Sequence, residues 1–228
     1  MGQGSSSQVV QLETRVENPS NGEPPCGLAL IAHGRLGGTF DQPPVRLLAE
    51  YLRDKRGLRV VTWNARGIGR SGGGNEWSDF GIWIGDAGIN DYHGYSAGAI
   101  FAGCTRPPRA FPQFASPYYI LVSYPIELNP LIAFHKSGSY FRSVEALVQG
   151  HGWENLPAEF QGHEPDVSGV LTVTGQFEGI FYGLWTQILG SKNARHVLRQ
   201  VLVDGAGHAW DDKAPRIVEE VDKWLSSI

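Results

Sequence analysis

Short apolar runs separated by polar loops dominate the pattern of this chain. Near the N-terminus Val10, Leu12, Thr14 and Val16 alternate with polar residues, which predicts a half-buried edge strand. The run at residues 28–32 is continuously apolar, as is typical of a strand that is buried on both faces of a parallel sheet. We expect further strands over residues 59–64, 118–123, 170–174 and 197–203.

Two stretches between or after these runs have the periodicity of amphipathic helices. The first begins near Pro43 and ends at Gly57, and the second begins at Pro215. Their apolar faces are Val45, Leu48, Ala49 and Leu52 in the first helix and Ile217, Val221, Trp224 and Leu225 in the second. Strands that alternate with helices predict an α/β fold, a mostly parallel sheet flanked by helices.

Composition narrows the class of protein. The chain has 228 residues, 41% of them hydrophobic and 18% charged, with a net charge of −4. This predicts one globular domain over residues 8–228 behind a disordered leader of residues 1–7. The charge is not basic enough to predict a nucleic-acid partner. No apolar run is long enough for a transmembrane helix.

The cysteines and the N-terminus bear on location. Cys26 and Cys104 have no spacing typical of a metal site, and no secretory signal precedes them, so we expect free thiols in the cytoplasm and no metal or other cofactor. The N-terminal MGQGSS matches the myristoylation pattern through Gly2 and Ser6. A polar disordered leader explains the same residues.

The motif with most chemical content is G-x-S-x-G at residues 94–98 (GYSAG). A serine hydroxyl needs a base within hydrogen-bond reach to act as a nucleophile, and small flanking residues allow the tight strand-to-helix turn called a nucleophile elbow. Ser96 is therefore the candidate nucleophile. A coincidental turn is the alternative, because the chain has 30 glycines.

A base and an acid follow in the sequence. His208 comes after the last apolar strand, where a loop can bring a base to the serine, although it is one of seven histidines and an exposed loop histidine is the alternative. Glu178 is the candidate acid after the strand at 170–174, unless it is an ordinary surface carboxylate. Asp204 and Asp166 are the other candidates for the acid.

An oxyanion hole needs two backbone N–H groups. Ala97, which follows the nucleophile, is the first candidate donor, and Arg35 or Leu36 in the loop after residues 28–32 is the second. The alternative for this glycine-rich loop is a phosphate-binding site. We disfavour it because no phosphate-binding glycine motif opens a helix there.

These segments occur in the order found in the α/β-hydrolase superfamily. Over residues 26–225 the chain resembles its small, carboxylesterase-like serine hydrolases, through His33-Gly34, residues 66–71 (RGIGRS), the serine motif, the acid loop and Gly207-His208. The resemblance implies hydrolysis of an ester, thioester or amide of a small-molecule acyl substrate through an acyl-enzyme. It also implies roles for five residues: Ser96 as nucleophile, Glu178 as acid, His208 as base, and Arg35 and Ala97 as oxyanion donors.

The approach to the serine motif is short. Residues 75–93 must supply a crossover helix of about a dozen residues and a strand of about five, and residues 89–93 (INDYH) are polar for a buried strand. We therefore expect an incomplete central strand and a block of about 20 residues, the size of a helix with its strand, missing relative to other members. The alternative function is a non-catalytic hydrolase-fold protein or a truncated isoform with a disrupted active site.

Residues 137–168 fit neither the helix nor the strand period, which favours a cap or lid. Aromatic residues are frequent there, and they are candidates for an apolar substrate pocket unless they simply pack a core. These candidates are Tyr140, Phe141, Trp153 and Phe160.

Overall fold

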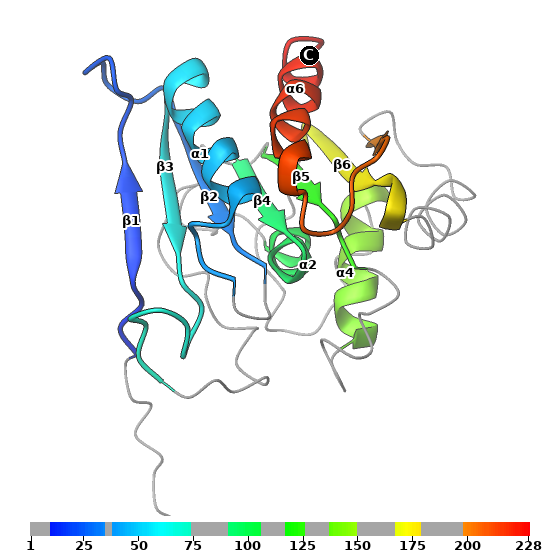
Figure 1. Ribbon diagram of the computed structural model, residues 1–228, viewed down its shortest axis with the longest axis horizontal. Helices are drawn as coiled ribbons and strands as arrows, with labels where there is room; N and C mark the ends of the chain where they lie inside the picture. The colour runs from blue at the N-terminus through cyan, green and yellow to red at the C-terminus, as the bar shows by residue number, and fades with distance from the viewer. Residues whose placement is uncertain are drawn as a thin grey trace, which may run out of the picture.

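A computed structural model of the chain describes residues 10–34, 38–73, 91–105, 117–125, 137–149, 167–178 and 198–228. The expected leader of residues 1–7, with Gly2, lies outside these ranges. The described residues form a seven-stranded sheet in the order β1-β3-β2-β4-β5-β6-β7 (Figure 1). Its strands are β1 (Thr14–Glu17), β2 (Gly27–Ala32), β3 (Leu58–Trp63), β4 (Asp91–Tyr95), β5 (Tyr118–Val122), β6 (Gly169–Gly175) and β7 (Leu198–Val203).

Only β1 runs antiparallel to its neighbour among these strands. The prediction of a mostly parallel α/β sheet is therefore confirmed, with strand ends close to those expected. The helices are α1 (Pro43–Arg56), α2 (Ala97–Cys104), α4 (Ser137–Gln149) and α6 (Ala214–Leu225), and two short 3-10 turns are η5 (Gln176–Glu178) and η6 (Asp211–Lys213).

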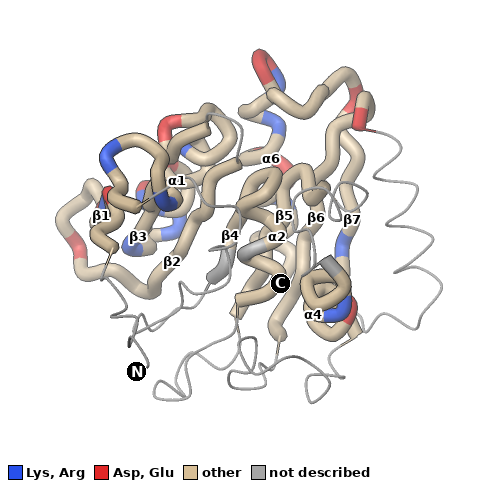
Figure 2. Tube along the Cα trace, turned by 90° about the horizontal axis from the view of Figure 1, so that it is seen from below, with Lys and Arg blue, Asp and Glu red and all other residues tan. Residues whose placement is uncertain are grey.

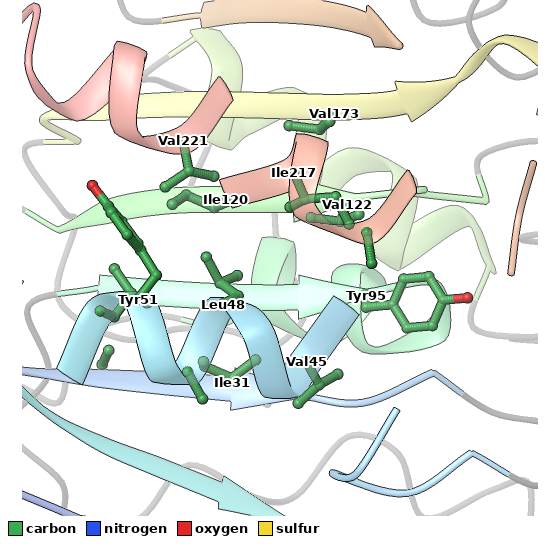
Figure 3. Packing of buried hydrophobic residues seen from close by; sticks show 14 of the residues in the cluster. Ile31, Val45, Leu48, Tyr51, Tyr95, Ile120, Val122, Val173, Ile217 and Val221 are labelled. Atoms are coloured by element: carbon green, nitrogen blue, oxygen red, sulfur yellow. The ribbon is translucent and has the colours of Figure 1, made fainter. Parts of the chain in front are cut away.

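Helices cover both faces of the sheet. On one face α1 and α6 pack over inward-facing side chains of the strands, and Figure 3 shows Leu48 and Ile217 between the helices and Ile31 and Ile120 of the sheet. On the other face α2 and α4 pack over side chains such as Leu121. The strands β2, β5 and β6 contain no charged residue, whereas charged residues gather on β1, β3 and α1 (Figure 2). The strands without charged residues thus lie around β4 in the interior of the sheet, where helices cover both faces.

The central strand is present. The expectation that it would be incomplete is wrong, because β4 pairs in parallel with β2 over Asp91–Gly94 and with β5 over Asp91–Tyr95. Five residues suffice here because backbone hydrogen bonds to two neighbours hold the strand on both sides. The polar Asp91 is the first residue of the strand. Residues 74–90, where the preceding helix was expected to be missing, lie outside the described residues.

Residues 137–149, which the sequence assigns to a possible cap or lid, are helical and packed in the core. They form α4, which lies against α2 and buries Tyr140, Val144 and Leu147 in the second core cluster. The helical period is obscured in the sequence because serine and glycine occupy its first turn. The remainder of the proposed cap, residues 150–166, lies outside the described residues.

The N-terminal segment fastens the loops at the carboxyl ends of β2 and β3. The carboxylate of Glu13 accepts hydrogen bonds from Asn64 Nδ2 (2.8 Å), the Arg70 backbone N–H (2.7 Å) and Arg70 Nε (2.8 Å). These bonds, the backbone one first, lower the pKa of Glu13 to about 2. Asn64 Oδ1 in turn accepts the Phe40 N–H at 3.0 Å. The loop with the RGIGRS sequence is therefore a structural support for the neighbouring loop after β2.

Neither Cys26 nor Cys104 is in a disulfide, as the sequence predicted, and the structure shows the first exposed and the second buried. Among the helices that the structure describes, none combines the length and the apolar character that crossing a membrane requires.

An imidazole is buried beside the first core cluster without a hydrogen-bond partner. His93 of β4 lies between Ile31 and Ile120 in the strand register and is 2% exposed. Neither ring nitrogen has a hydrogen-bond partner in the structure. Burial lowers the pKa of His93 to about 3, because the charged imidazolium is poorly solvated there.

The lowered pKa of His93 predicts that the free energy of unfolding depends on pH. The unfolded chain takes up a proton at His93 near pH 6.5 and the folded chain does not, so stability present above pH 6.5 falls as the pH drops toward 3, by about 1.4 kcal/mol per pH unit. We expect His93→Leu to be neutral or stabilising at pH 7.5 and to remove this part of the acid sensitivity. Urea unfolding at pH 7.5, 6 and 5 measures it, and parallel pH dependences of the two proteins would contradict it.

Candidate active site

The backbone turns sharply between β4 and α2. Ser96 is the N-cap of α2 with φ 55° and ψ −123°, a conformation that residues other than glycine rarely adopt. Its N–H donates to the Val122 carbonyl at 2.9 Å, which ties the turn to the end of β5. The turn leaves Ser96 as the link between strand and helix, as the G-x-S-x-G motif predicts.

Two glycines make this turn possible. A Cβ on Gly94 would overlap the Gly98 carbonyl group, and a Cβ on Gly98 would overlap the Ala32 carbonyl group. The obstructing atoms are backbone atoms of paired strands and a helix, so they have no rotamer to change. Glycine is therefore required at both positions for close approach of the backbone.

We expect Gly94→Ala and Gly98→Ala each to destabilise the fold by at least about 3 kcal/mol, because the added methyl group displaces paired backbone. The matched control is Gly138→Ala in the first turn of α4, where a Cβ meets nothing within 4 Å. That change is expected to be neutral or to stabilise by about 0.5–1 kcal/mol, since alanine favours helix. Urea unfolding of the three variants measures the effect, and equal stabilities would refute the close-approach explanation.

Three predicted residues meet at the carboxyl ends of the strands. Ser96 Oγ lies 2.9 Å from His208 Nε2, and His208 Nδ1 lies 3.0 Å from Glu178 Oε2. Ser96 follows β4, Glu178 ends η5 directly after β6, and His208 lies in the loop after β7. A carboxylate accepts hydrogen bonds, so this network assigns the His208 proton to Nδ1 and leaves Nε2 to accept the Ser96 hydroxyl.

The Glu178 carboxylate and the His208 imidazole differ in exposure. Glu178 is 4% exposed, whereas the side chain of His208 is 47% exposed. Glu178 Oε1 accepts hydrogen bonds from Ser123 Oγ (2.8 Å) and from the Gly175 N–H (3.2 Å). The buried carboxylate thus has donors on both oxygens, which offset the loss of its hydration.

Backbone and side-chain hydrogen bonds join the loop that carries Glu178 to the loop that carries His208. The Phe177 N–H donates to the Ala206 carbonyl at 3.0 Å, and the Gly205 N–H donates to Gln176 Oε1 at 2.8 Å. These bonds hold η5 beside the loop after β7, so the distance between Glu178 and His208 depends on backbone contacts as well as on the side-chain bond.

Tyr95 contacts His208 through both its ring and its hydroxyl. Its ring stacks on the His208 imidazole with centroids 5.7 Å apart, and its hydroxyl donates to the His208 carbonyl at 2.5 Å. Burial, with the Glu178 and Asp211 charges, raises the pKa of Tyr95 to about 12, so the hydroxyl stays a donor. Tyr95, which directly precedes Ser96, thereby holds the loop that carries His208.

The candidate oxyanion site is partly described. Ala97 is the first residue of α2, and an N–H group at a helix N-terminus has no intrahelical acceptor. Arg35 and Leu36 lie outside the described residues. The start of their loop is packed against the nucleophile, because a Cβ on Gly34 would lie 3.1 Å from the Ser96 Cβ.

His33 and Gln42 hold that loop. His33 Nε2 accepts the Ala65 N–H at 3.0 Å, so its proton is assigned to Nδ1, which bonds to the Gly34 carbonyl. Burial lowers the pKa of His33, which favours this neutral form. The Gly34 N–H donates to Gln42 Oε1 at 3.1 Å. The His33-Gly34 pair therefore holds the start of this loop in place beside Ser96.

The other candidates are placed as follows. Tyr140 is 3% exposed in the core between α4 and α2, so the structure gives it a packing position instead of the predicted substrate contact, and Phe141 packs half-buried against the same cluster. Asp204 is exposed in the turn after β7, and Glu178 is the carboxylate that contacts His208. Trp153, Phe160 and Asp166 lie outside the described residues. In the part of the chain that is described, no group of three metal-binding side chains is found.

Sequence reasoning missed three residues beside the site. Tyr95, Ser123 and Trp210 contact His208 or Glu178 directly or through one another. Tyr95 lies at the end of a strand and Ser123 directly after one, where loops of a parallel sheet gather. That position was the available signal, but a serine or an aromatic residue at a strand end is too common to identify a contact.

No protein-family model and no curated protein matches this sequence. Solved structures do resemble it. An α/β serine hydrolase homologue from Coxiella burnetii has a TM-score of 0.59 at 18% identity, covering 98% of this chain and 100% of that one. Est1E from Butyrivibrio proteoclasticus with ferulic acid bound has a TM-score of 0.63 at 16% identity, with 96% and 95% covered. The enol-lactonase from Burkholderia xenovorans has 0.57 at 15% identity, with 95% and 97% covered.

These likenesses extend over nearly the whole of each chain and agree with the strand order and helix layers of the sheet. The chain has the α/β-hydrolase fold.

Proposed function

We propose that the chain is a serine hydrolase that cleaves an ester, thioester or amide through an acyl-enzyme. The observation that carries this proposal is the unbroken series of hydrogen bonds from Ser96 Oγ through the His208 imidazole to Glu178. A nucleophile, a base and a group that orients the base are the three parts that acyl transfer by serine requires. Here each comes from a different strand end of one sheet.

The first half of the reaction follows from this geometry. Ser96 Oγ attacks the acyl carbon while His208 Nε2 takes the hydroxyl proton, and the Glu178 carboxylate stabilises the imidazolium. The oxyanion receives hydrogen bonds from the backbone N–H of Ala97 and of Arg35, as the family resemblance implies. His208 then gives the proton to the leaving group, and the acyl group stays on Ser96.

In the second half, water attacks the acyl-enzyme with His208 as base, and the acid product leaves with Ser96 restored. No cofactor is needed for either half. The structural neighbours favour a carboxylic ester as substrate, since one is named an enol-lactonase and another holds ferulic acid. We propose a small acyl substrate and, from the two free cysteines, a cytoplasmic location.

A fluorophosphonate probe tests the nucleophile. We expect the probe to label the folded protein at Ser96, because the hydroxyl lies 2.9 Å from a base, and we expect Ser96→Ala to abolish labelling. Intact mass and peptide mass spectrometry measure the site. Protein that unfolds cooperatively and yet stays unlabelled would overturn the proposal and favour the non-catalytic alternative.

The acid is tested by a pair of substitutions. Glu178→Gln is expected to lower the labelling rate by about 10³- to 10⁴-fold, because an amide no longer stabilises the imidazolium or selects its tautomer. Asp204→Asn, at the exposed carboxylate in the turn after β7, is the control and is expected to stay within about twofold of the unsubstituted protein. A larger effect of Asp204→Asn than of Glu178→Gln would reassign the acid.

A further inference from the structure

The loop after β5 contributes a side chain to the acid. Ser123 is 1% exposed, its N–H donates to the Val173 carbonyl at 2.8 Å, and its Oγ lies 2.8 Å from Glu178 Oε1. Trp210 Nε1 lies 2.7 Å from the same Oγ, and Trp210 is also 1% exposed. A buried hydroxyl therefore stands between the indole and the carboxylate.

The direction of these two bonds is fixed by chemistry. An indole N–H only donates, so the Ser123 oxygen accepts from Trp210, and its own proton is left for Glu178 Oε1. The two donors of Oε1, Ser123 and Gly175, lie on the side of the carboxylate away from His208. With Oε1 held there, Oε2 is the oxygen that faces His208 Nδ1.

The series of contacts closes on itself. Trp210 lies two residues after His208 in the same loop, so the indole bonds Ser123, Ser123 bonds Glu178, and Glu178 bonds the imidazole of that loop. Movement of His208, Glu178 or the loop after β5 therefore breaks at least one of these hydrogen bonds. Three buried side chains, Trp210, Ser123 and Glu178, thus hold the half-exposed imidazole, and a connected hydrogen-bond network is stiffer than its separate pairs.

Backbone strain marks the same residues. Among the described residues, the non-glycine positions with positive φ are Ser96 (55°), Ser123 (51°) and Trp210 (62°). Such conformations are costly for residues other than glycine and concentrate where function needs them. One is the proposed nucleophile, and the other two hold the acid, so the strain in the described chain is confined to this one assembly.

We propose that Ser123 is a positioning residue of the hydrolytic site, which holds the Glu178 carboxylate so that its free oxygen faces His208, and that Trp210 directs the Ser123 hydroxyl. This inference rests on the proposed function for its kinetic consequence. Ser123 touches neither substrate nor the reacting atoms, and it acts through Glu178.

Two substitutions of Ser123 separate the hydroxyl from the backbone. Ser123→Gly removes the hydroxyl but adopts the positive φ without strain, so the relief of strain offsets part of the stability lost with the hydrogen bonds. Ser123→Ala removes the same hydroxyl and keeps the strain, so it is expected to be the less stable of the two. Both are expected to lower the fluorophosphonate labelling rate alike, by about 10- to 100-fold, the effect of losing one hydrogen bond to a charged group.

A spectroscopic measurement follows the position of the acid without turnover. The Nδ1 proton of His208, bonded to Glu178 Oε2 at 3.0 Å, is expected to give a resolved downfield proton resonance that exchanges slowly with water. In Ser123→Gly and Ser123→Ala this resonance is expected to move upfield or broaden, because the carboxylate is no longer held. Trp210→Phe is expected to have the same effect to a smaller degree, since the hydroxyl remains but loses its direction.

The outcomes are distinct. The inference is overturned if Ser123→Gly keeps the labelling rate within about twofold, the range of an unconnected substitution, or if the His208 resonance is unchanged in both variants. It is also overturned if the rate follows stability, falling in Ser123→Ala and recovering in Ser123→Gly. If the unsubstituted protein is not labelled at all, the proposed function fails, while the His208 resonance still decides whether Ser123 positions Glu178.

Discussion

The close contact between the end of β4 and the start of α2 is the constraint on which the site depends. Gly94 lies against the Gly98 carbonyl group, and Gly98 lies against the Ala32 carbonyl group of the neighbouring strand. Because no side chain separates these backbones, the chain reverses within one residue and Ser96 takes a positive φ. Every other feature of the site, from the imidazole to the loop after β2, is placed relative to that fixed hydroxyl.

A buried carboxylate sets the second requirement. Glu178 is 4% exposed, so its charge must be met by donors from the protein. Ser123 and His208 supply them from the loops after β5 and β7, and Gly175 supplies one from the end of β6. The hydrogen bonds to the Glu178 carboxylate therefore link the loops after β5, β6 and β7. The orientation of the His208 imidazole depends on all three of these loops.

Some residues around the site lower the stability of the fold, and the packing of the core must offset this loss. A histidine without hydrogen bonds, His93, lies in β4 two residues before Tyr95 and three before the strained Ser96. The apolar layers under α1 with α6 and under α2 with α4 supply the compensating burial. This combination is typical of a site at which local stability gives way to the placement of groups.

The sequence by itself determined the apolar strands, the helices at Pro43 and Pro215, and the three residues Ser96, Glu178 and His208, because each follows from a local period or a position after a strand. Only the tertiary structure decided that β4 is complete, since its stability comes from two neighbouring strands rather than from its own polar composition. It also decided the contacts of Ser123, which is 55 residues from Glu178 and 87 from Trp210 in the sequence. A single serine has no sequence pattern that identifies its hydrogen-bond partners. Those partners come together only when the loops converge in the folded chain.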